Sequence, residues 1–240
     1  MTGGSWGIGR AIVERLGRGG ADVVLSYVQD EGAGRDVQAA VAESGSRAEV
    51  VQPDLGRLED IRALFDQVQR QMDGFDILVN NAGADIEARI AEATEEDYDQ
   101  VMTINAKGTF FAMQEAARRM RDGERIINIS SVNTIFPQPG IGIYAASKGA
   151  VEQFARVAAR ELSGRGITVN IVSPGTTDTD MFHTWNSPQA VEQLTALTPL
   201  GRIGEPADVA DVVGFLAGPD ARWLTGEHLH ASGGLPMGCP

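Results

Sequence analysis

Short runs of β-branched and other apolar residues alternate with longer segments of helical spacing along most of this 240-residue chain. Strands that alternate with helices across short gaps pair in parallel and are joined by right-handed crossovers. The alternation therefore predicts an α/β fold in a single domain, with a doubly wound parallel sheet between two helical layers. The expected strands are 21–26, 48–52, 75–79, 124–129, 167–172 and 227–231, and the expected helices are 10–16, 31–44, 58–72, 94–120, 144–163 and 206–216.

The glycine-rich opening, Thr2–Gly9, leads directly into the first helical pattern. Free backbone N–H groups and the dipole at a helix start attract an anion, and glycine lets a pyrophosphate come close. Gly3, Gly7 and Gly9 therefore predict a cradle for a dinucleotide. A flexible glycine-rich tail is the alternative, which the helix that follows disfavours.

A cradle of this kind normally follows a strand, and here only Met1 precedes it. The first strand of a doubly wound sheet is central, so its loss would remove hydrogen-bond partners on both sides. We therefore expect the first strand to be missing from this sequence and the natural protein to begin about 8–15 residues earlier. A truncated or misassigned start is the alternative.

Tyr144 and Lys148 are four residues apart, so they share one face of a helix. A nearby ammonium favours phenolate and is expected to lower the pKa of the tyrosine. The hydroxyl of Ser131, thirteen residues earlier, can hold a carbonyl oxygen while the phenol donates a proton to it. This combination suits reduction of a ketone or oxidation of an alcohol, although the Tyr–Lys spacing alone is also typical of an ordinary helix edge.

Composition excludes several other classes. The formal net charge of −13 argues against nucleic-acid and anionic membrane partners, which need basic patches. No apolar run approaches the roughly 18 residues of a membrane span, and no signal peptide is visible, so we expect a cytoplasmic protein. Cys239 is the single cysteine, which excludes an internal disulfide. His228 and His230 share a strand face without an evident third ligand, so we expect surface or interface histidines and no metal.

Three further sites follow expected strands or interrupt a helix. Asp54 ends the strand 48–52, where it can accept from an adenine amino group or simply cap a loop. The small residues of Asn80–Gly83 allow the backbone to lie against a sugar. Asn105 is a poor helix former in mid-helix, which indicates either surface polarity or a kink that places a polar group in the site.

Together these motifs resemble the short-chain dehydrogenase/reductase family in its single-domain form, which has a Rossmann fold. Each motif is weak alone, but the set follows the family's order and spacing across essentially the whole chain, with the missing first strand as the one large departure. The matching pieces are Thr2–Gly9, Asp54–Leu55, Asn80–Gly83, Asn105, Ser131, Tyr144 with Lys148, Pro174–Gly175, Leu224–Glu227 and Gly233–Gly234.

The resemblance implies roles for these residues. Tyr144 would be the general acid in reduction and the base in oxidation, while Lys148 would lower its pKa and hold the nicotinamide ribose. Ser131, favoured over Ser130 by its spacing, would position the carbonyl, and Asn105 would hold a water that links Lys148 to solvent. The implied cofactor-binding residues are Gly3, Ser5, Trp6, Gly7, Ile8, Gly9, Ser26, Asp54, Leu55, Asn81, Ala82, Gly83, Tyr144, Lys148, Pro174, Gly175, Thr177 and Thr179.

The choice between the two nicotinamide cofactors depends on the end of the strand 21–26. An acidic residue there receives the ribose 2′-hydroxyl, and its absence leaves room for a 2′-phosphate. Ser26 occupies the position, so the sequence favours NADP(H), with NAD(H) as the alternative. Trp6 replaces the basic residue that is often found in the glycine loop, and Arg10 and Arg35 are the candidate substitutes.

Within the family, the chain is most similar to 3-oxoacyl-[acyl-carrier-protein] reductases and polyketide or naphthol ketone reductases. The implied function is an NADP(H)-dependent oxidoreductase that moves a hydride between the cofactor and a ketone or secondary alcohol. An NAD-dependent sugar or polyol dehydrogenase and a non-catalytic cofactor-binding regulator are the alternatives. The implied substrate residues are Ser131, Phe136, Tyr144, Phe182 and Trp185, with packing of the lid as the alternative role for the three apolar aromatic residues.

The domain is expected to cover residues 1–240, with 176–204 as an irregular substrate lid, because ligands of open α/β sheets bind beyond the carboxyl ends of the strands. Family members are commonly tetramers. The helix after Tyr144 carries an apolar stripe of Phe154, Val157, Ala158 and Leu162, which agrees with a homotetramer but also with simple packing on the sheet.

Overall fold

The computed structural model describes residues 1–235, apart from the side chains of Met181 and Trp185. The strands are β1 (Val23–Ser26), β2 (Ala48–Val51), β3 (Ile77–Asn80), β4 (Arg125–Ile129), β5 (Thr168–Pro174) and β6 (His228–Ala231). In this part of the chain every strand pair is parallel, and the hydrogen-bonded order is β1-β2 in one sheet and β3-β4-β5-β6 in the other. The predicted α/β class with a parallel sheet is therefore confirmed.

Residues 1–4 join the two sheets. Thr2 forms a parallel bridge with Asn80 of β3, while Ser26 of β1 donates its backbone N–H to the Met1 carbonyl at 3.0 Å. On the same side, Gly4 N donates to Ser26 O at 2.8 Å. The expected loss of hydrogen-bond partners on both sides is therefore not confirmed, because a few extended residues already occupy the position between β1 and β3.

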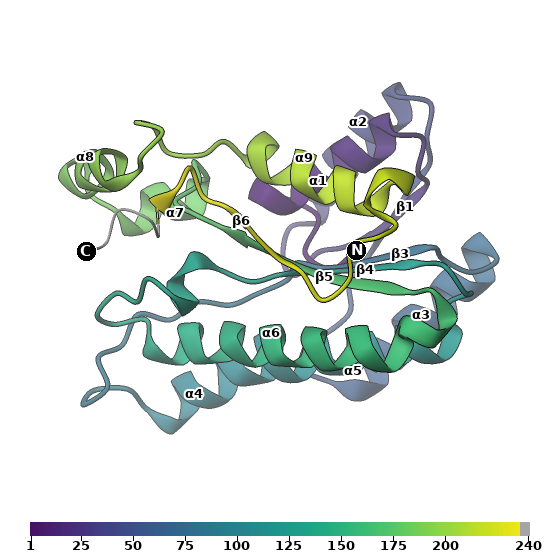
Figure 1. The fold of residues 1–240 in the computed structure, drawn as a ribbon, viewed down its shortest axis with the longest axis horizontal. Helices are drawn as coiled ribbons and strands as arrows, with labels where there is room; N and C mark the ends of the chain where they lie inside the picture. Colours follow the sequence, from purple (N-terminus) through teal and green to yellow (C-terminus); the bar gives the residue numbers. More distant parts are fainter. Residues whose placement is uncertain (236–240) are drawn as a thin grey trace.

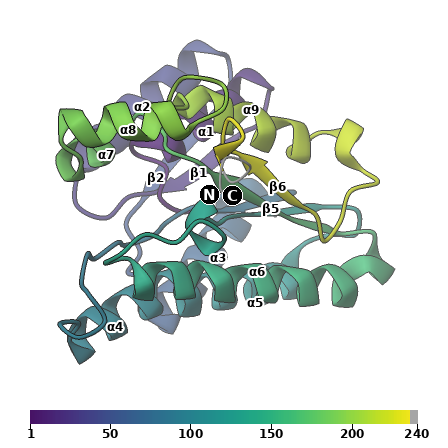
Figure 2. The same ribbon diagram turned by 60° about the vertical axis from the view of Figure 1, so that its left-hand side comes forward.

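Helices cover both faces of the sheet (Figures 1 and 2). One face is covered by α1, α2 and α9, and the other by α3, α5 and α6. The helices are α1 (Gly7–Arg18), α2 (Glu31–Glu43), α3 (Leu58–Met72), α4 (Glu95–Val101), the π-helix η1 (Met102–Gly108), α5 (Thr109–Arg119), α6 (Gly142–Leu162), α7 (Asp180–Trp185), α8 (Pro188–Leu197) and α9 (Pro206–Ala217), with short 3₁₀ turns η2 (Val132–Thr134), η3 (Ser163–Arg165) and η4 (Pro219–Ala221).

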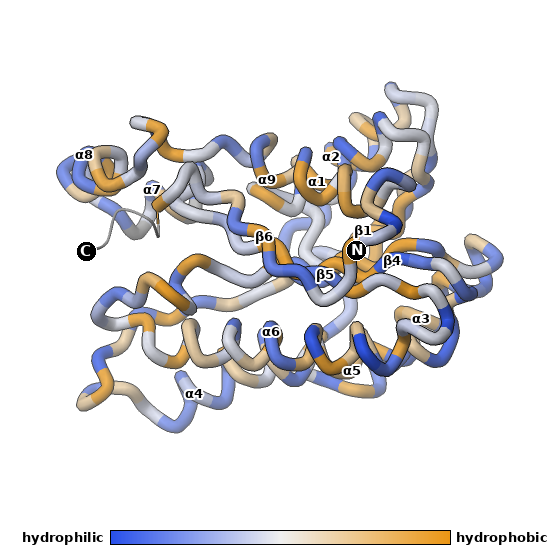
Figure 3. Tube along the Cα trace, viewed as in Figure 1, coloured by the Kyte–Doolittle hydropathy of each residue, from blue (hydrophilic) through white to orange (hydrophobic). Residues whose placement is uncertain are grey.

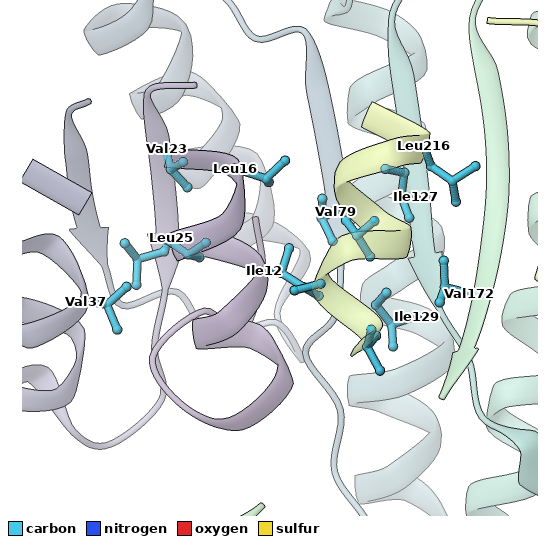
Figure 4. Packing of buried hydrophobic residues seen from close by; sticks show 14 of the residues in the cluster. Ile12, Leu16, Val23, Leu25, Val37, Val79, Ile127, Ile129, Val172 and Leu216 are labelled. Carbon is cyan, nitrogen blue, oxygen red and sulfur yellow. The ribbon is translucent and has the colours of Figure 1, made fainter. Parts of the chain in front are cut away.

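Two hydrophobic cores follow from the alternation of side chains along the strands. In β4, Ile127 and Ile129 belong to the core beneath α1 and α9 (Figure 4). Ile126 belongs to the core on the other face, with α5 and α6. Leu78 and Val79 of β3 divide between the cores in the same way. Figure 3 shows hydrophobic positions recurring along the central strands. β3 and β4 are therefore apolar on both faces.

Two segments differ from the sequence expectation. The segment 176–200 is not irregular, because it contains α7 and α8. Local caps explain both helices: Thr179 accepts from Phe182 N, and Ser187 accepts from Ala190 N just before a proline at the first helical position. The predicted helix 94–120 is interrupted by the π-helix η1, which contains Asn105. Asn105 is fully buried, so the alternative of surface polarity is wrong. None of the helices in residues 1–235 is both long and apolar enough to cross a membrane.

Candidate active site

The carboxyl ends of β3, β4 and β5 lie at one edge of the sheet because the strands are parallel. The connections that leave them carry Asn81–Gly83, Ser130–Ser131 and Pro174–Gly175. The sequence motifs that were separated by up to about a hundred residues are therefore neighbours at this edge, where open α/β sheets bind their ligands.

α6 presents Tyr144 and Lys148 to the end of β4. Tyr144 hydrogen-bonds Ser131, so the two hydroxyl groups that the sequence assigned to one substrate oxygen are neighbours. Lys148 is 4% exposed and its Nζ donates to the Ile129 carbonyl oxygen at 3.0 Å. Its Nζ lies 5.7 Å from the centroid of the Tyr144 ring. The structure thus brings these three functional groups together around the first residue after β4.

The pKa of Tyr144 is raised in the structure, whereas the sequence predicted that Lys148 would lower it. Burial, followed by the negative charge of Asp85, raises the pKa of Tyr144 to about 12, although its hydrogen bond with Ser131 opposes the shift. Burial lowers the pKa of Lys148 to about 8, against an upward effect of Asp85. Desolvation is the largest cause, so the phenol keeps its proton at neutral pH, which is the form that donates in reduction.

Asn105 fixes the loop after β3 from inside the π-helix η1. Its side chain is fully buried and holds the backbone of Ala84 at two points: Ala84 N donates to Oδ1 at 2.7 Å, and Nδ2 donates to Ala84 O at 2.8 Å. Nδ2 also donates to Ser147 Oγ at 3.0 Å. A methyl group added at Gly83 would lie 3.3 Å from Lys148 Nζ. Asn105 therefore holds this loop closely over the lysine.

Asp85 follows Ala84, the residue that Asn105 holds, and the sequence analysis did not identify it. Burial raises the pKa of its carboxyl group, whereas the positive charge of Lys148 lowers it. Asp85 in turn affects the pKa of both Tyr144 and Lys148. Its place two residues after Asn80–Gly83, in the loop beyond a strand end, was the available signal.

The glycine cradle is closed around the start of α1. Gly3 and Gly7 have positive φ angles of 65° and 53°, and a Cβ at Gly9 would lie 1.9 Å from Gly3 O. Asn81 Nδ2 donates to Gly3 O at 2.7 Å, which ties the cradle to the loop after β3. A side chain at Gly3 or Gly9 would collide with neighbouring backbone atoms, and the start of the helix is free of acidic residues, so the segment fits the pyrophosphate of a dinucleotide.

The remaining predicted cofactor residues are placed as follows. Ser26 is buried and its Oγ accepts from Gly3 N at 3.0 Å, so its hydroxyl shapes the cradle. Asp54 Oδ1 accepts from Gly56 N at 2.8 Å, which is the loop-capping alternative, while leaving Oδ2 for a ligand. Trp6 is 50% exposed at the start of α1, whereas Ser5 is buried.

The two ends of the expected lid, residues 176–204, lie side by side. Thr177 forms a bridge with Gly204, and Asp178 N donates to Gly204 O at 2.7 Å. A Cβ at Gly7 would lie 3.3 Å from Thr179 Cγ2, so the cradle and the lid are in direct contact. Pro174 and Gly175 continue β5, and Thr177 Oγ1 donates to Gly175 O at 2.9 Å.

The predicted aromatic substrate set is not brought together by any described contact. Phe182 packs edge-on against His183, with ring centroids 5.3 Å apart. Phe136 follows the turn η2, where its N–H donates to Val132 O. The side chain of Trp185 lies outside the described residues, so its role stays a prediction.

A buried polar cluster behind the site was also missed. Ser130 Oγ donates to Glu152 Oε1 at 2.7 Å, and His228 Nε2 lies 2.6 Å from Ser173 Oγ. Of the two histidines expected at a surface or an interface, His230 is exposed, whereas the side chain of His228 is 13% exposed and lies in this cluster. The four-residue spacing from Lys148 to Glu152 was a signal for this cluster, but its partners are distant in sequence.

Known proteins resemble this chain over nearly its full length. A family model described as enoyl-(acyl carrier protein) reductase matches residues 3–236. An uncharacterized oxidoreductase of Methylorubrum extorquens is 41% identical, covering 98% of this chain and 96% of the relative. The NADPH-dependent aldehyde reductase-like chloroplastic protein of Arabidopsis thaliana is 39% identical, over 98% and 92%. A hydroxynaphthalene reductase-like protein of Metarhizium brunneum is 36% identical, over 98% and 92%.

Among solved structures, the angucycline C-6 ketoreductase LanV with bound NADP has a TM-score of 0.93 and 42% identity, covering 98% of this chain and 94% of that one. A second LanV structure contains both NADP and rabelomycin and has a TM-score of 0.89, at the same identity and coverage.

A parallel α/β sheet with a glycine cradle at its carboxyl edge, matched at this level to oxidoreductases, defines the class of the protein: a dinucleotide-dependent oxidoreductase. More specifically, the chain belongs to the short-chain dehydrogenase/reductase family.

Proposed function

We propose that this protein is an NADP(H)-dependent ketoreductase. The observation that carries the proposal is the hydrogen bond of Tyr144 to Ser131 beside the buried Lys148, at the edge of the sheet that also carries the glycine cradle. LanV binds NADP, and the relative from Arabidopsis thaliana is described as NADPH-dependent, which favours the phosphorylated cofactor. Both supports come from relatives that span more than nine-tenths of this chain.

The cofactor would lie along the carboxyl edge of the sheet. The cradle at residues 3–9 would take the pyrophosphate, and the segment 174–179 would take the nicotinamide. Asp54 and Leu55 would flank the adenine, while Asn81–Gly83 would contact the adjoining ribose. Bound NADPH supplies the hydride for the reaction.

The proton comes from this chain. Tyr144 donates it to the substrate oxygen, and Ser131 holds that oxygen through its hydroxyl. The Lys148 ammonium stabilises the negative charge that develops on the phenol. Asn105 fixes the loop beside the lysine, so the pair keeps its geometry while the proton moves. In the reverse direction the same tyrosine accepts the proton from an alcohol.

The 2′-phosphate of NADP(H) would lie near the start of α1, and Trp6, Arg10 and Arg35 are the candidate contacts. Trp6 offers an indole N–H but no positive charge. Arg10 and Arg35 each pair with a glutamate on their own helix, at 2.8 and 2.5 Å, in exposed positions. Such exposed pairs contribute little, about 0–1 kcal/mol, so either arginine can turn to a phosphate without a large loss.

The substrate would be an aromatic or polyketide-type ketone. Rabelomycin in LanV and the description of the Metarhizium relative favour this class over an acyl thioester. The lid 176–204, with Phe182 and Trp185, and the turn with Phe136 would line the apolar part of the pocket. A homotetramer in the cytoplasm is the assembly and the location that we propose from the sequence.

The proposal is tested by titrating the protein with NADPH and NADH and then assaying a panel of aliphatic, acyl-thioester and aromatic ketones. We expect a kcat/KM for NADPH at least about tenfold above that for NADH, and turnover of the aromatic ketones. The reverse cofactor preference with turnover of polyols would indicate the sugar dehydrogenase, and binding without any turnover would indicate the regulator.

The replacement Tyr144→Phe keeps the aromatic ring and removes the hydroxyl group that donates the proton. We expect turnover to fall by at least about 1,000-fold, because the general acid is lost, while the affinity for NADPH changes little. Steady-state kinetics and fluorescence titration measure the two quantities. Turnover near that of the wild type would contradict the role of Tyr144.

A further inference from the structure

α6 contacts the end of β4 with three successive turns. The first two carry Tyr144 and Lys148, which hold the outer residues of the segment 129–131. Glu152, on the third turn, accepts from the hydroxyl of the middle residue, Ser130, at 2.7 Å. The proposed catalytic machinery uses the first two turns and leaves the third without a role.

Glu152 is 6% exposed, and its carboxylate would be costly at this depth without partners. Besides Ser130, Arg156 Nη2 lies 3.6 Å from its Oε2, and His228 Nδ1 lies 3.7 Å from the same atom. Of these contacts, the one from Ser130 has hydrogen-bond length and fixes the carboxylate in place, while Arg156 supplies a nearby positive charge.

His228 continues the cluster to the next strand. Its Nε2 is 2.6 Å from the hydroxyl of Ser173, a residue of β5 that directly precedes Pro174–Gly175. Burial lowers the pKa of His228, against the upward effect of Glu152. The row Ser173–His228–Glu152 has the residue types of a hydrolytic triad, but Ser173 is fully buried and no substrate can reach it. Its role is therefore to connect the two strand ends.

We propose that Glu152 is a positioning residue that, with His228, ties the end of β4 to the end of β5. The first end carries Ser131, which holds the substrate oxygen, and the second carries the segment proposed to contact the nicotinamide. The inference rests on the proposed function. Backbone hydrogen bonds already pair the two strands, including Ser130 N to Val172 O at 2.8 Å. The cluster adds side-chain contacts just beyond this pairing, where Ser131 and Pro174 follow, and Glu152 itself touches neither reacting partner.

The test compares Glu152→Ala with Glu152→Gln in NADPH-dependent reduction of a ketone that the wild type accepts. We expect Glu152→Ala to lower kcat by about 10–100-fold, because a misplacement of about 1 Å is sufficient for such a loss. KM should stay within about threefold. The amide oxygen of Gln still accepts from Ser130, so Glu152→Gln should recover kcat to within about threefold of the wild type.

Glu115 provides the matched control. It is also a buried glutamate, 3% exposed, and it pairs with Arg119 at 2.8 Å on α5, away from the strand ends. Glu115→Ala should lower the melting temperature and leave kcat unchanged. An equal kcat loss in Glu115→Ala, or equal losses in both Glu152 variants, would show a purely structural role.

Two further measurements cover the remaining outcomes. If Glu152→Ala does not fold, Ser130→Ala breaks the same hydrogen bond with a smaller change and should lower kcat by about 3–10-fold. Hydrogen–deuterium exchange of residues 126–136 measures how firmly the end of β4 is held, and it does not depend on enzyme activity. Glu152→Ala or Ser130→Ala should accelerate exchange there, while Glu152→Gln and Glu115→Ala should not. Unchanged exchange in these variants would overturn the inference, whether or not the wild type reduces a ketone. A wild type that reduces no ketone would overturn only the proposed function.

Discussion

Lys148 is held as a nearly buried ammonium whose described hydrogen bond goes to a carbonyl oxygen. Burial lowers its pKa from 10.5 to about 8, so the folded protein binds this proton less tightly than the unfolded chain does. The folded state therefore carries a charge at neutral pH that destabilises it. Such a cost is typical of functional sites, where stability is lower than the chain could reach.

Replacement Lys148→Met should stabilise the protein while abolishing turnover. A pKa lowered from 10.5 to about 8 corresponds to about 3 kcal/mol, and loss of the hydrogen bond to Ile129 leaves a gain of about 2 kcal/mol at pH 7. The unfolded lysine keeps its proton up to 10.5, so the wild type gains stability as the pH rises from 8 to 10.5, and the difference shrinks in that window. Urea denaturation at pH 7 and pH 10 measures both effects, and a less stable variant at pH 7 would contradict them.

Asp85→Asn tests the carboxylate beside the site. Its negative charge raises the pKa of Tyr144, so its removal should make the phenolate easier to form. We expect the rising limb of the pH profile for alcohol oxidation to move down by about 0.5–1 pH unit. Glu87→Gln is the control, because this carboxylate lies two residues further along, against Gly140. A profile for Asp85→Asn that coincides with that of the wild type would exclude the effect.

At the scale of elements, α1 and α6 use glycine for opposite reasons. Gly9 lies where any side chain would collide with the Gly3 carbonyl oxygen, whereas Gly149 of α6 faces open space. The first glycine is required by the cradle, and the second only weakens a helix. Alanine at Gly9 therefore tests cofactor binding, whereas alanine at Gly149 tests only helix propensity.

Gly9→Ala should lose most of its NADPH affinity, by at least about tenfold, because the backbone of the cradle must move. Gly149→Ala should stabilise the protein by about 0.5–1 kcal/mol and bind NADPH normally. Thermal unfolding with and without NADPH measures both, since a ligand that binds the folded state raises the melting temperature. An NADPH-dependent rise in Gly9→Ala equal to that of the wild type would argue against the cradle.

At the scale of the whole molecule, α5 and α6 leave apolar side chains on their outer face. Val157 is 54% exposed and Phe110 is 41% exposed, and the rings of Phe110 and Phe154 meet edge-on at 5.1 Å. A hollow of about 530 Å³ lies beside them, lined by Met102, Thr103, Ala106, Lys107, Phe110 and Phe154. The apolar stripe predicted from the sequence therefore does not pack only on the sheet, and its exposed part supports the proposed homotetramer.

Val157→Glu should disrupt this assembly. A charge in the middle of an apolar interface is expected to shift the protein from a mass of four 25.5 kDa chains to a smaller species. Light scattering after size exclusion gives the mass. Val28→Glu, at a residue that is 69% exposed in the loop after β1, should leave the mass unchanged. A wild-type monomer would refute the tetramer itself.

The sequence predicted the elements because their signals are local. Alternating periods and helix caps act over a few residues, so α3 begins and ends where expected, and most other elements agree within about two residues. The two lid helices were missed although their caps, Thr179 and Ser187, are visible in the sequence, since each helix is short and its apolar pattern is weak.

By itself, the sequence determined the α/β class, the cradle and the order of the motifs, since these depend on neighbouring residues and on strands ending at one edge. Only the tertiary structure decided the chemistry around them. Burial, which no local pattern encodes, raised the pKa of Tyr144 where its spacing from Lys148 predicted a lower one. The Glu152–His228 cluster likewise depends on hydrogen bonds between residues 22 and 55 positions apart, which meet only when the strands are side by side.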